Sequence, residues 1–260
     1  MKENFTETLA VFQCFDEYQK AKEHHEKALS IAIEIGHRKG IGKHYGNLGM
    51  VFHSLSEYEK AKEFSEKALA IAVEIGDKEG EGISYSNLGS VFHSLTEYQR
   101  AMECHEKALD IAKEIGDKQS EGRGYGNLGT LLIIFPGTLF KFLGQYWKAK
   151  DYFQMALAIA MEIGDREGEG ESYRSLGTLF QSLGDHQMAK DYLEKALATA
   201  IEIGHREEER RCYENLGNVF HSLGEYQKAK QHYEKGISIT KEIGDRQRKR
   251  AVLREPWKCL

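Results

Sequence analysis

The stretch Tyr85-Ser-Asn-Leu-Gly-Ser-Val-Phe92 decides the fold, because related versions of it begin at Tyr45, Tyr125, Tyr173 and Tyr213. Successive copies start forty residues apart, except for one step of forty-eight residues between Tyr125 and Tyr173. A second segment, which reads EYQKAKEHHEKALSIAIEIG at residues 17–36, recurs at the same intervals. The chain is therefore a tandem array of a two-segment repeat, and one repeat carries an eight-residue insertion.

Both segments have the periodicity of α-helices. In the first segment, Tyr85, Leu88, Gly89 and Phe92 are spaced as one face of a 3.6-residue period. In the second, the alanines and isoleucines between Ala101 and Ile115 are spaced in nearly the same way. No segment shows the alternation of a half-buried strand, so the sequence predicts an all-α fold with two helices in each repeat.

The residues between the segments favour tight connections. Ile75-Gly76-Asp77 and its copies place a glycine where a helix can end in the left-handed conformation, and the following Asp or His is expected to cap the next helix. Between the two helices of a repeat, Ser56-Glu-Tyr-Glu59 and Thr96-Glu-Tyr-Gln99 fit the capping box. These signals predict antiparallel helix pairs.

A glycine recurs inside the first helix of each pair, where it costs about 1 kcal/mol relative to alanine. We expect this cost to be offset by close approach of the paired helix at its small residues Ala101 and Ala108, and we favour packing over a ligand role. The glycines concerned are Gly49, Gly89, Gly129, Gly177 and Gly217.

The pattern Tyr85-x2-Leu88-Gly89-x2-Phe92, followed by Ala101-x3-His105-x2-Ala108, resembles the tetratricopeptide repeat. This resemblance implies a right-handed superhelical α-solenoid of antiparallel helix pairs. The forty-residue period resembles the Pins/LGN G-protein signalling modulator arrays and related large animal proteins. The chain lacks GoLoco motifs, so Gα binding is not carried over. The aromatic residue expected four positions after the alanine is present as Phe153 or Tyr233, but other repeats have His25, Ser65, His105 or Leu193.

The array divides into six predicted repeats: residues 1–36, 37–76, 77–116, 117–164, 165–204 and 205–244. The first is degenerate, because Thr8 and Leu9 replace Leu-Gly between Phe5 and Phe12. Residues 245–260 are expected to form a short capping helix, about Arg246 to Arg254, and a tail. Terminal repeats are commonly atypical, so the first repeat is either a cap or an internal repeat cut short. The incomplete ends are also compatible with a fragment of a longer protein.

The apolar insertion, Leu131 to Thr138, lies in the fourth repeat. Pro136-Gly137 is expected to stop the first helix near Phe135 and to leave residues 136–144 as an apolar turn. The insertion is either a loop that docks on a partner or a membrane, or an insertion that was tolerated without a function. We favour the tolerated insertion.

Composition and charge narrow the class of partner. The net charge of −5 and the pI near 6.2 argue against a nucleic-acid groove. The basic cluster Arg246, Arg248, Lys249 and Arg250 is interpreted as a solvated end, with a nuclear-import or phosphate patch as the alternative. Four cysteines without a CxxC pair suit a reducing compartment. No signal peptide or membrane span is predicted, and we expect a cytoplasmic protein.

Catalytic and metal-binding signatures are missing from the sequence. The eleven histidines include adjacent pairs that cannot share a helix face, such as His24-His25. No HExxH, phosphate-binding glycine loop or GxSxG elbow occurs. We therefore predict a protein that is not an enzyme and has no cofactor or metal.

The resemblance implies that the first helices of the pairs line the concave side, where an asparagine recurs. Amide side chains donate and accept, so a row of asparagines can pair with the backbone of an extended peptide. In Pins/LGN and kinesin light chain arrays, asparagines of this row act in this way. A capping or bridging role between helices is the alternative. The row comprises Asn47, Asn87, Asn127 and Asn215, with Ser175 in the fifth repeat.

A second row further along the same helices contains His53, His93, Ile133, Gln181 and His221. Small residues beside Lys43, Ile83 and Arg123 are expected to leave room in repeats two to four, whereas Arg174 and Glu214 fill it later. A chaperone-type carboxylate clamp is not expected, because Gly46 and Met50 stand where it needs polar residues. The candidate partner-binding residues are Asn47, Asn87, Asn127, Asn215, His53, His93, His221, Lys43, Arg123 and Arg174.

These observations favour a protein–protein interaction scaffold or adaptor that holds an extended peptide. The family resemblance suggests a setting in G-protein signalling or cell division. A structural array that associates end to end is the alternative, and an RNA-binding helical array is the third possibility. Salt dependence distinguishes the last from the first, because phosphate binding weakens steeply with salt.

Overall fold

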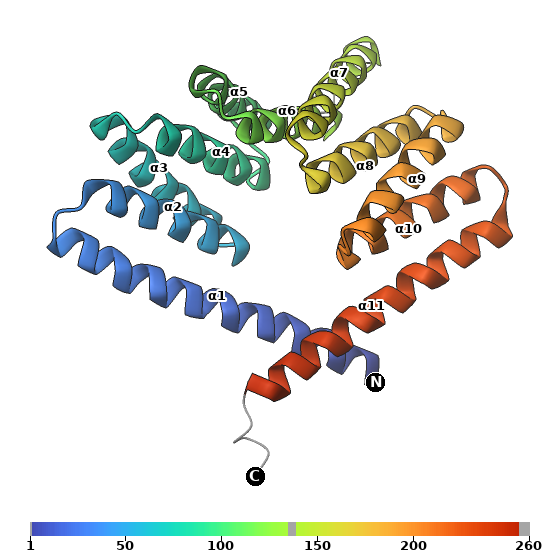
Figure 1. Ribbon diagram of the computed structural model, residues 1–260, viewed down its shortest axis with the longest axis horizontal. Coiled ribbons are helices and arrows are strands. Elements are labelled where there is room, and N and C mark those ends of the chain that lie inside the picture. Colours follow the sequence, from blue (N-terminus) through green and yellow to red (C-terminus); the bar gives the residue numbers. More distant parts are fainter. Residues whose placement is uncertain (1, 135–138, 255–260) are drawn as a thin grey trace. The chain divides into compact units, whose positions relative to one another are not determined.

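The computed structural model (Figure 1) describes the backbone of residues 2–134 and 139–254, and the side chains of residues 18–134 and 144–244. Every regular element in the described backbone is an α-helix, which confirms the all-α prediction. The helices are α1 (Lys2–Glu34), α2 (Arg38–Ser54), α3 (Tyr58–Ile75), α4 (Lys78–Ser94), α5 (Tyr98–Ile115), α6 (Lys118–Ile134), α7 (Leu139–Ile163), α8 (Arg166–Ser182), α9 (His186–Glu202), α10 (Arg206–Ser222) and α11 (Tyr226–Arg254).

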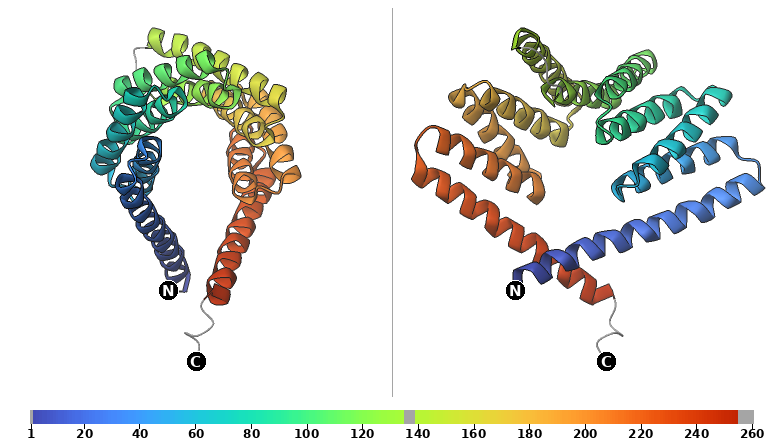
Figure 2. Two further views of the ribbon diagram at one scale, coloured as in Figure 1. Left: turned by 60° about the vertical axis from the view of Figure 1, so that its left-hand side comes forward. Right: turned by 180° about the vertical axis from the view of Figure 1, so that it is seen from behind.

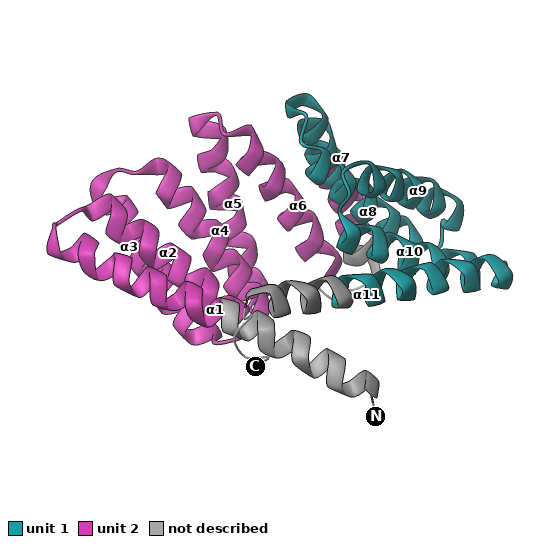
Figure 3. Ribbon diagram, turned by 60° about the horizontal axis from the view of Figure 1, so that its bottom comes forward, with its two compact units in different colours: residues 1–11, 153–260 teal, residues 12–152 magenta. Residues whose placement is uncertain are grey.

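Two compact units make up the chain (Figure 3): unit 1 contains residues 1–11 and 153–260, and unit 2 contains residues 12–152. In unit 2, α2 packs against α3 and α4 packs against α5; in unit 1, α8 packs against α9 and α10 against α11. The antiparallel course of these pairs can be followed in Figure 2. The first helices of successive pairs also touch, α2 with α4 and α8 with α10.

The core of each unit is built from the apolar positions of the repeat. In unit 2, Leu48, Phe52, Ala61 and Val91 form one buried cluster. In unit 1, a homologous cluster is centred on Leu193, Leu216 and Phe220, which are at most 4% exposed. The leucine of the Leu-Gly pair is at most 4% exposed in all five copies, as expected for the face that each first helix turns towards its pair.

Both terminal helices differ from the predictions. The first repeat was expected to contain two helices, but α1 is one helix of 33 residues. The predicted capping helix at Arg246–Arg254 is instead the continuation of α11 through Gly244. A helical hairpin closes when both segments have apolar faces to bury against each other. Thr8-Leu9 replaces Leu-Gly at one end, and residues 245–250 are all polar at the other, so neither segment offers the regular face.

The structure also contradicts the predicted capping boxes in the connections within the helix pairs. Ser56 and Thr96 are not capping-box residues: they have φ of 60° and 61°, and Glu57 and Glu97 precede the next helices. They take the left-handed position that Gly184 and Gly224 occupy in unit 1. The predicted glycine ends are confirmed at Gly36, Gly76, Gly116, Gly164 and Gly204, with φ of 69–72°, but not at Gly244, which lies inside α11. The predicted caps form at some positions and not at others. Asp117, Asp165 and His205 each accept a backbone N–H, whereas His37 and Asp77 do not.

The insertion lengthens a helix instead of forming the predicted turn over residues 136–144. α6 ends at Ile134 and α7 begins at Leu139, seven residues before Tyr146, where the repeat would otherwise start its second helix. Residues 139–143 contain neither glycine nor proline, so a helix can extend back through them. At the other side of the insertion, Leu131 and Leu132 are 2% and 5% exposed and belong to the core. The remaining residues of the predicted turn, 136–138, lie outside the described residues.

Candidate binding surface

The recurring glycine makes room for one side chain of the paired helix. A Cβ atom added at Gly89 would lie 2.5 Å from the His105 ring, and one at Gly177 would lie 2.6 Å from Leu193. Gly49 faces Ser65 and Gly217 faces Tyr233 in the same way. The packing interpretation is confirmed: the nearest atoms belong to the residue four positions after the alanine, and at Gly49 and Gly177 the backbone carbonyl of that alanine, Ala61 or Ala189, also lies 3.2 Å from the added Cβ. The sequence variation at that position therefore lies in the helix–helix contact.

His105 occupies this space behind the asparagine row. Its side chain is 3% exposed, and its Nδ1 lies 3.5 Å from the Nδ2 of Asn127. Burial, with a smaller contribution from the charge of His93, lowers the pKa of His105 to about 4. His105 is therefore neutral at physiological pH and can accept from Asn127. The sequence analysis missed this supporting residue, although its sixteen-residue spacing from Gly89 could have indicated it.

Three of the four predicted asparagines lie at homologous positions in unit 2, on α2, α4 and α6. Asn47, Asn87 and Asn127 are half-buried, each with part of its side chain open to solvent. Within the described part of the chain, the amides of Asn47 and Asn87 make no hydrogen bond, and Asn127 has only the long contact to His105. Their donors and acceptors are available to a ligand. Asn215 is half-buried on α10 of unit 1, so it is described separately from this row.

The predicted histidine row is engaged in packing. His53, His93 and His221 each lie against the tyrosine that starts the next helix, with ring centroids 5.5, 5.9 and 5.3 Å apart. Nε2 of His53 is also 2.8 Å from the Ser94 hydroxyl, and burial lowers the pKa of His53. These contacts brace the turn within each pair. The histidines are consequently weaker candidates for ligand contact than the asparagines.

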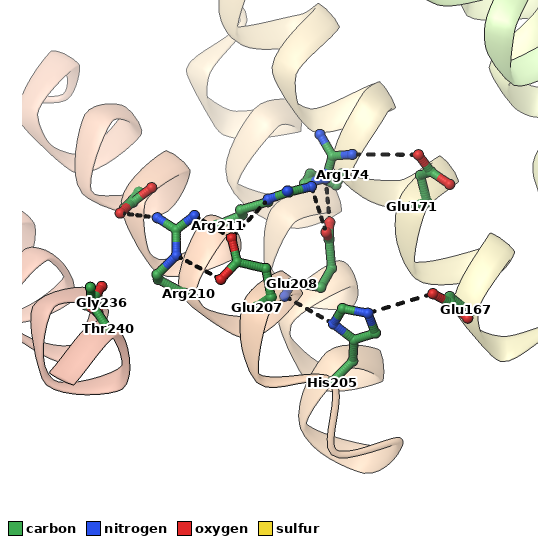
Figure 4. Close-up of polar contacts among 11 residues, drawn as sticks. Glu167, Glu171, Arg174, His205, Glu207, Glu208, Arg210, Arg211, Gly236 and Thr240 are labelled. Atoms are coloured by element: carbon green, nitrogen blue, oxygen red, sulfur yellow. Dashed lines mark hydrogen bonds and ion pairs between the residues drawn. The ribbon is translucent and has the colours of Figure 1, made fainter. Parts of the chain in front are cut away.

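The charged candidates differ between the units. Lys43 and Arg123 in unit 2 are exposed and form no ion pair with the described residues. In unit 1, Arg174 is tied to Glu208 and lies 3.7 Å from Glu171 (Figure 4). The structure brings Arg174 into a network of the protein's own charges instead of presenting it to a partner.

That network continues along α10, as Figure 4 shows. Arg210 bridges Glu207 and Glu214 with nitrogen–oxygen distances of 2.6 and 2.5 Å, and Arg211 approaches Glu207 at 3.5 Å. Arg174 and Glu214 both have ion-pair partners, and the expectation that they fill the space beside the asparagine row stays a prediction. The sequence analysis did not anticipate Glu207 and Glu208 as those partners. The run of charged residues from Arg206 to Arg211, three glutamates flanked by arginines, was the available signal.

Other chemistry is sparse in the described part of the chain. No three potential metal ligands come together there, and none of its helices is long and apolar enough to cross a membrane. Burial raises the pKa of the Cys212 thiol to about 12, which leaves it protonated and unreactive at neutral pH.

A family model described as the tetratricopeptide repeat matches residues 10–74, 40–114, 137–202 and 190–242. The chain belongs to the tetratricopeptide repeat family. The matched segments include α2 to α4 and α8 to α10, whereas α6 lies between the matched segments. A search of curated proteins found no significant match.

Solved structures share the tetratricopeptide architecture at low sequence identity. BtubC from P. vanneervenii is 20% identical with a TM-score of 0.72, over 87% of this chain and 92% of that one. A Rap protein complexed with Competence and Sporulation Factor is 14% identical with a TM-score of 0.65, over 91% and 74%. A putative kinesin light chain of Podospora anserina is 17% identical with a TM-score of 0.58, over 77% and 95%. These likenesses show the fold alone.

Proposed function

We propose that this tetratricopeptide protein is a non-enzymatic scaffold that holds an extended peptide segment of a partner protein across α2, α4 and α6 of unit 2. The observation that carries the proposal is the row of Asn47, Asn87 and Asn127. These amides are half-buried, lie at homologous positions and have few or no hydrogen bonds within the described residues. Adjacent helices thereby offer the same polar group at regular intervals.

The chemistry of the amide explains why such a row suits a peptide. Each asparagine offers a carbonyl acceptor and an N–H donor, and the backbone of an extended peptide carries the complementary groups. Recognition of the backbone tolerates different ligand side chains. The Rap structure, which has a related fold, is complexed with Competence and Sporulation Factor, and this supports a ligand-holding role for the array.

The location, the number of repeats, the pathway and the further contact residues are also parts of this proposal. We place the protein in the cytoplasm and divide its chain into six repeats. Because of the resemblance to Pins/LGN arrays, we also propose a setting in G-protein signalling or cell division. Asn215, with the histidines His53, His93 and His221, is assigned a secondary role in partner contact. Arg174 is a contact only for a ligand that displaces Glu208 from it.

Self-association through an array end is the second candidate. Ile237 on α11 is 55% exposed, whereas Leu109 at the homologous position of α5 is 5% exposed. An exposed side chain at a core position favours a further helix packing there. Light scattering between about 1 and 100 µM protein would detect such stacking as a concentration-dependent mass, and Ile237→Ser would remove it.

The main proposal can be tested with a peptide selected on the wild-type protein from a random library. Replacing Asn47, Asn87 and Asn127 with alanine removes three hydrogen bonds worth about 1 kcal/mol each, so affinity should fall on the order of 100-fold. The control carries Glu26→Gln, Glu66→Gln and Glu106→Gln, at exposed positions of α1, α3 and α5. Helicity measured by circular dichroism should be equal in both variants. Unchanged affinity in the asparagine variant would refute the proposal.

A further inference from the structure

The positions one turn before the asparagines form a second row on the same helices. Lys43, Ile83 and Arg123 precede Asn47, Asn87 and Asn127 by four residues, a spacing that places each pair on one helix face. Lys43 and Arg123 are exposed, and Ile83 is 51% exposed. α2, α4 and α6 therefore present a cation, an apolar side chain and a second cation in that order.

Although the charge of Arg123 contributes to lowering the pKa of Asp117, neither cation forms an ion pair with the described residues, which distinguishes them from their counterparts in unit 1. There, Glu171 and Arg211 occupy the homologous positions, and each lies 3.5–3.7 Å from a charge of opposite sign on its own helix. Glutamates in the first turns of α4 and α6 are also committed, Glu81 to Lys78 and Glu121 to Lys118. Lys43 and Arg123 are thus not held in ion pairs by the described part of the protein.

Space for a ligand backbone lies between the two rows. At Gly126 no atom lies within 4 Å of an added Cβ, whereas Gly46 is buried and a Cβ there would contact the Ala68 side chain and the Asn87 amide. The same position carries Arg174 and Glu214 in unit 1, and both of these side chains belong to the network in Figure 4. An approaching peptide therefore meets little steric obstruction on α6 beside the Asn127 amide.

We infer that the ligand is an extended peptide in which an apolar side chain is flanked on both sides by carboxylates. This inference rests on the proposed function. The apolar side chain packs on Ile83, and the carboxylates pair with Lys43 and Arg123 while the asparagines hold the backbone. Glu79, which is exposed one turn before Ile83, disfavours a carboxylate at the centre.

The spacing of the carboxylates follows from helix packing. Packed helices lie about 8–10 Å apart, so two such steps would separate Lys43 and Arg123 by roughly 16–20 Å, a lower bound because α2 packs against α4 but α4 and α6 are not a closely packed pair. An extended chain advances about 3.3 Å per residue, so the two acidic residues should be at least about five to six positions apart. Because exposed charges are screened by salt, these pairs should determine which peptides bind and how quickly more than the total affinity.

The experiment uses a fluorescent twelve-residue peptide of glycine and serine that contains two glutamates six positions apart and a leucine four positions after the first, so that the three side chains lie on one side of the extended chain. Matched peptides replace both glutamates with glutamine, both with lysine, or the leucine with serine. Binding to the full chain is measured by fluorescence anisotropy at low and high salt. The wild-type protein should bind the glutamate peptide on the order of tenfold more tightly than the glutamine peptide, and this preference should shrink at high salt.

Charge reversal supplies the decisive comparison. Lys43→Glu with Arg123→Glu should invert the preference, so that the lysine peptide binds more tightly than the glutamate peptide. The control Lys20→Glu with Lys27→Glu changes the net charge equally at exposed positions of α1 and should keep the wild-type preference. Equal affinity of the wild-type protein for the glutamate and glutamine peptides would overturn the inference. Tighter binding of a single-stranded RNA oligonucleotide at the same cations would also overturn it.

Different results would contradict the proposed function and the inference about ligand charge. If library-selected peptides depend on Asn47, Asn87 and Asn127 but show no acidic preference, the peptide-holding function stands and the inference about ligand charge is wrong. If the asparagine variant binds the selected peptides normally, the site itself is wrong. A preference for the glutamate peptide that is lost on charge reversal supports the inference directly.

Discussion

The imidazole of His105 lies directly over the backbone of Gly89, 2.5 Å from the place where a Cβ would stand. The ring is nearly inaccessible to solvent and forms part of the contact between α4 and α5. Replacing Gly89 with alanine should therefore destabilise the protein by about 1–3 kcal/mol, because overpacking outweighs the gain in helix propensity. Urea denaturation followed by circular dichroism measures this change.

Gly126 is the matched control for that substitution. It also lies inside a first helix, but no atom is within 4 Å of an added Cβ. Gly126→Ala should stabilise the protein by about 0.5–1 kcal/mol through helix propensity alone. Equal effects at the two glycines would contradict the packing role assigned to Gly89.

Burial of His105 predicts a specific pH dependence of stability. The pKa is lowered from 6.5 to about 4 in the folded protein, so the folded state resists a proton that the unfolded chain accepts. This contribution to stability is complete above pH 6.5 and is lost as the pH falls towards 4, by at most about 3 kcal/mol. His105→Leu copies the Leu193 arrangement and should flatten the profile in this window. Thermal unfolding of both proteins between pH 4 and 7.5 tests this prediction. An unchanged dependence of stability on pH in the variant would rule out His105 as the source of that dependence.

The left-handed conformation of Ser56 and Thr96 predicts stabilising substitutions. Residues with a Cβ are strained at φ near 60°, whereas glycine is not. Ser56→Gly and Thr96→Gly should each raise the free energy of unfolding by about 0.5–1 kcal/mol. Gly184→Ser, made where φ is 80°, should lower it by a similar amount. Melting temperatures moving in the same direction for all three variants would be inconsistent with this strain.

Ser65 is fully buried against Gly49, and its hydroxyl has no hydrogen-bond partner among the described residues. An unsatisfied buried hydroxyl is unfavourable, so Ser65→Ala should stabilise the protein by about 1 kcal/mol. Ser84 provides the contrast, because its buried hydroxyl donates to the Gly80 carbonyl at 2.7 Å. Ser84→Ala should therefore be neutral or destabilising. Denaturant midpoints of the two variants should separate, and coincident midpoints would argue against an unsatisfied Ser65.

The regular repeats could be predicted from sequence because one pattern sets both helices and their contact. Leu48 and Leu88 were recognised by periodicity, and both are buried. The ends could not be predicted, because α1 and α11 depend on whether Thr8-Leu9 and the polar residues after Gly244 find a surface to pack on. Periodicity within a segment does not show whether that segment forms a separate helix or continues the neighbouring one. The prediction at Ser56 failed for a related reason, since serine is favourable as a cap and is recognised in a left-handed turn only from coordinates.

The positions of the candidate surface residues could be predicted from the sequence, but their hydrogen bonds and ion pairs could not. Asn47, Asn87 and Asn127 occur at homologous positions, as the repeat requires. The availability of their amides, the support of Asn127 by His105 and the neutralisation of Arg174 by Glu208 all depend on contacts between residues 22–34 positions apart. Such pairings are set by tertiary geometry, and side-chain identity alone does not reveal them.

The network around Arg174, Arg210 and Glu214 has a consequence for engineering. The residues that hold α8 and α10 in place are the buried leucines and phenylalanines, whereas the charges lie at positions that repeats two to four leave to glycine, serine and free cations. On the proposed function, recognition and architecture therefore depend on different positions of the same repeat. Transplanting Gly46, Lys43 and Asn47 into the equivalent positions of α8 should then add a second recognition site without changes to the buried residues.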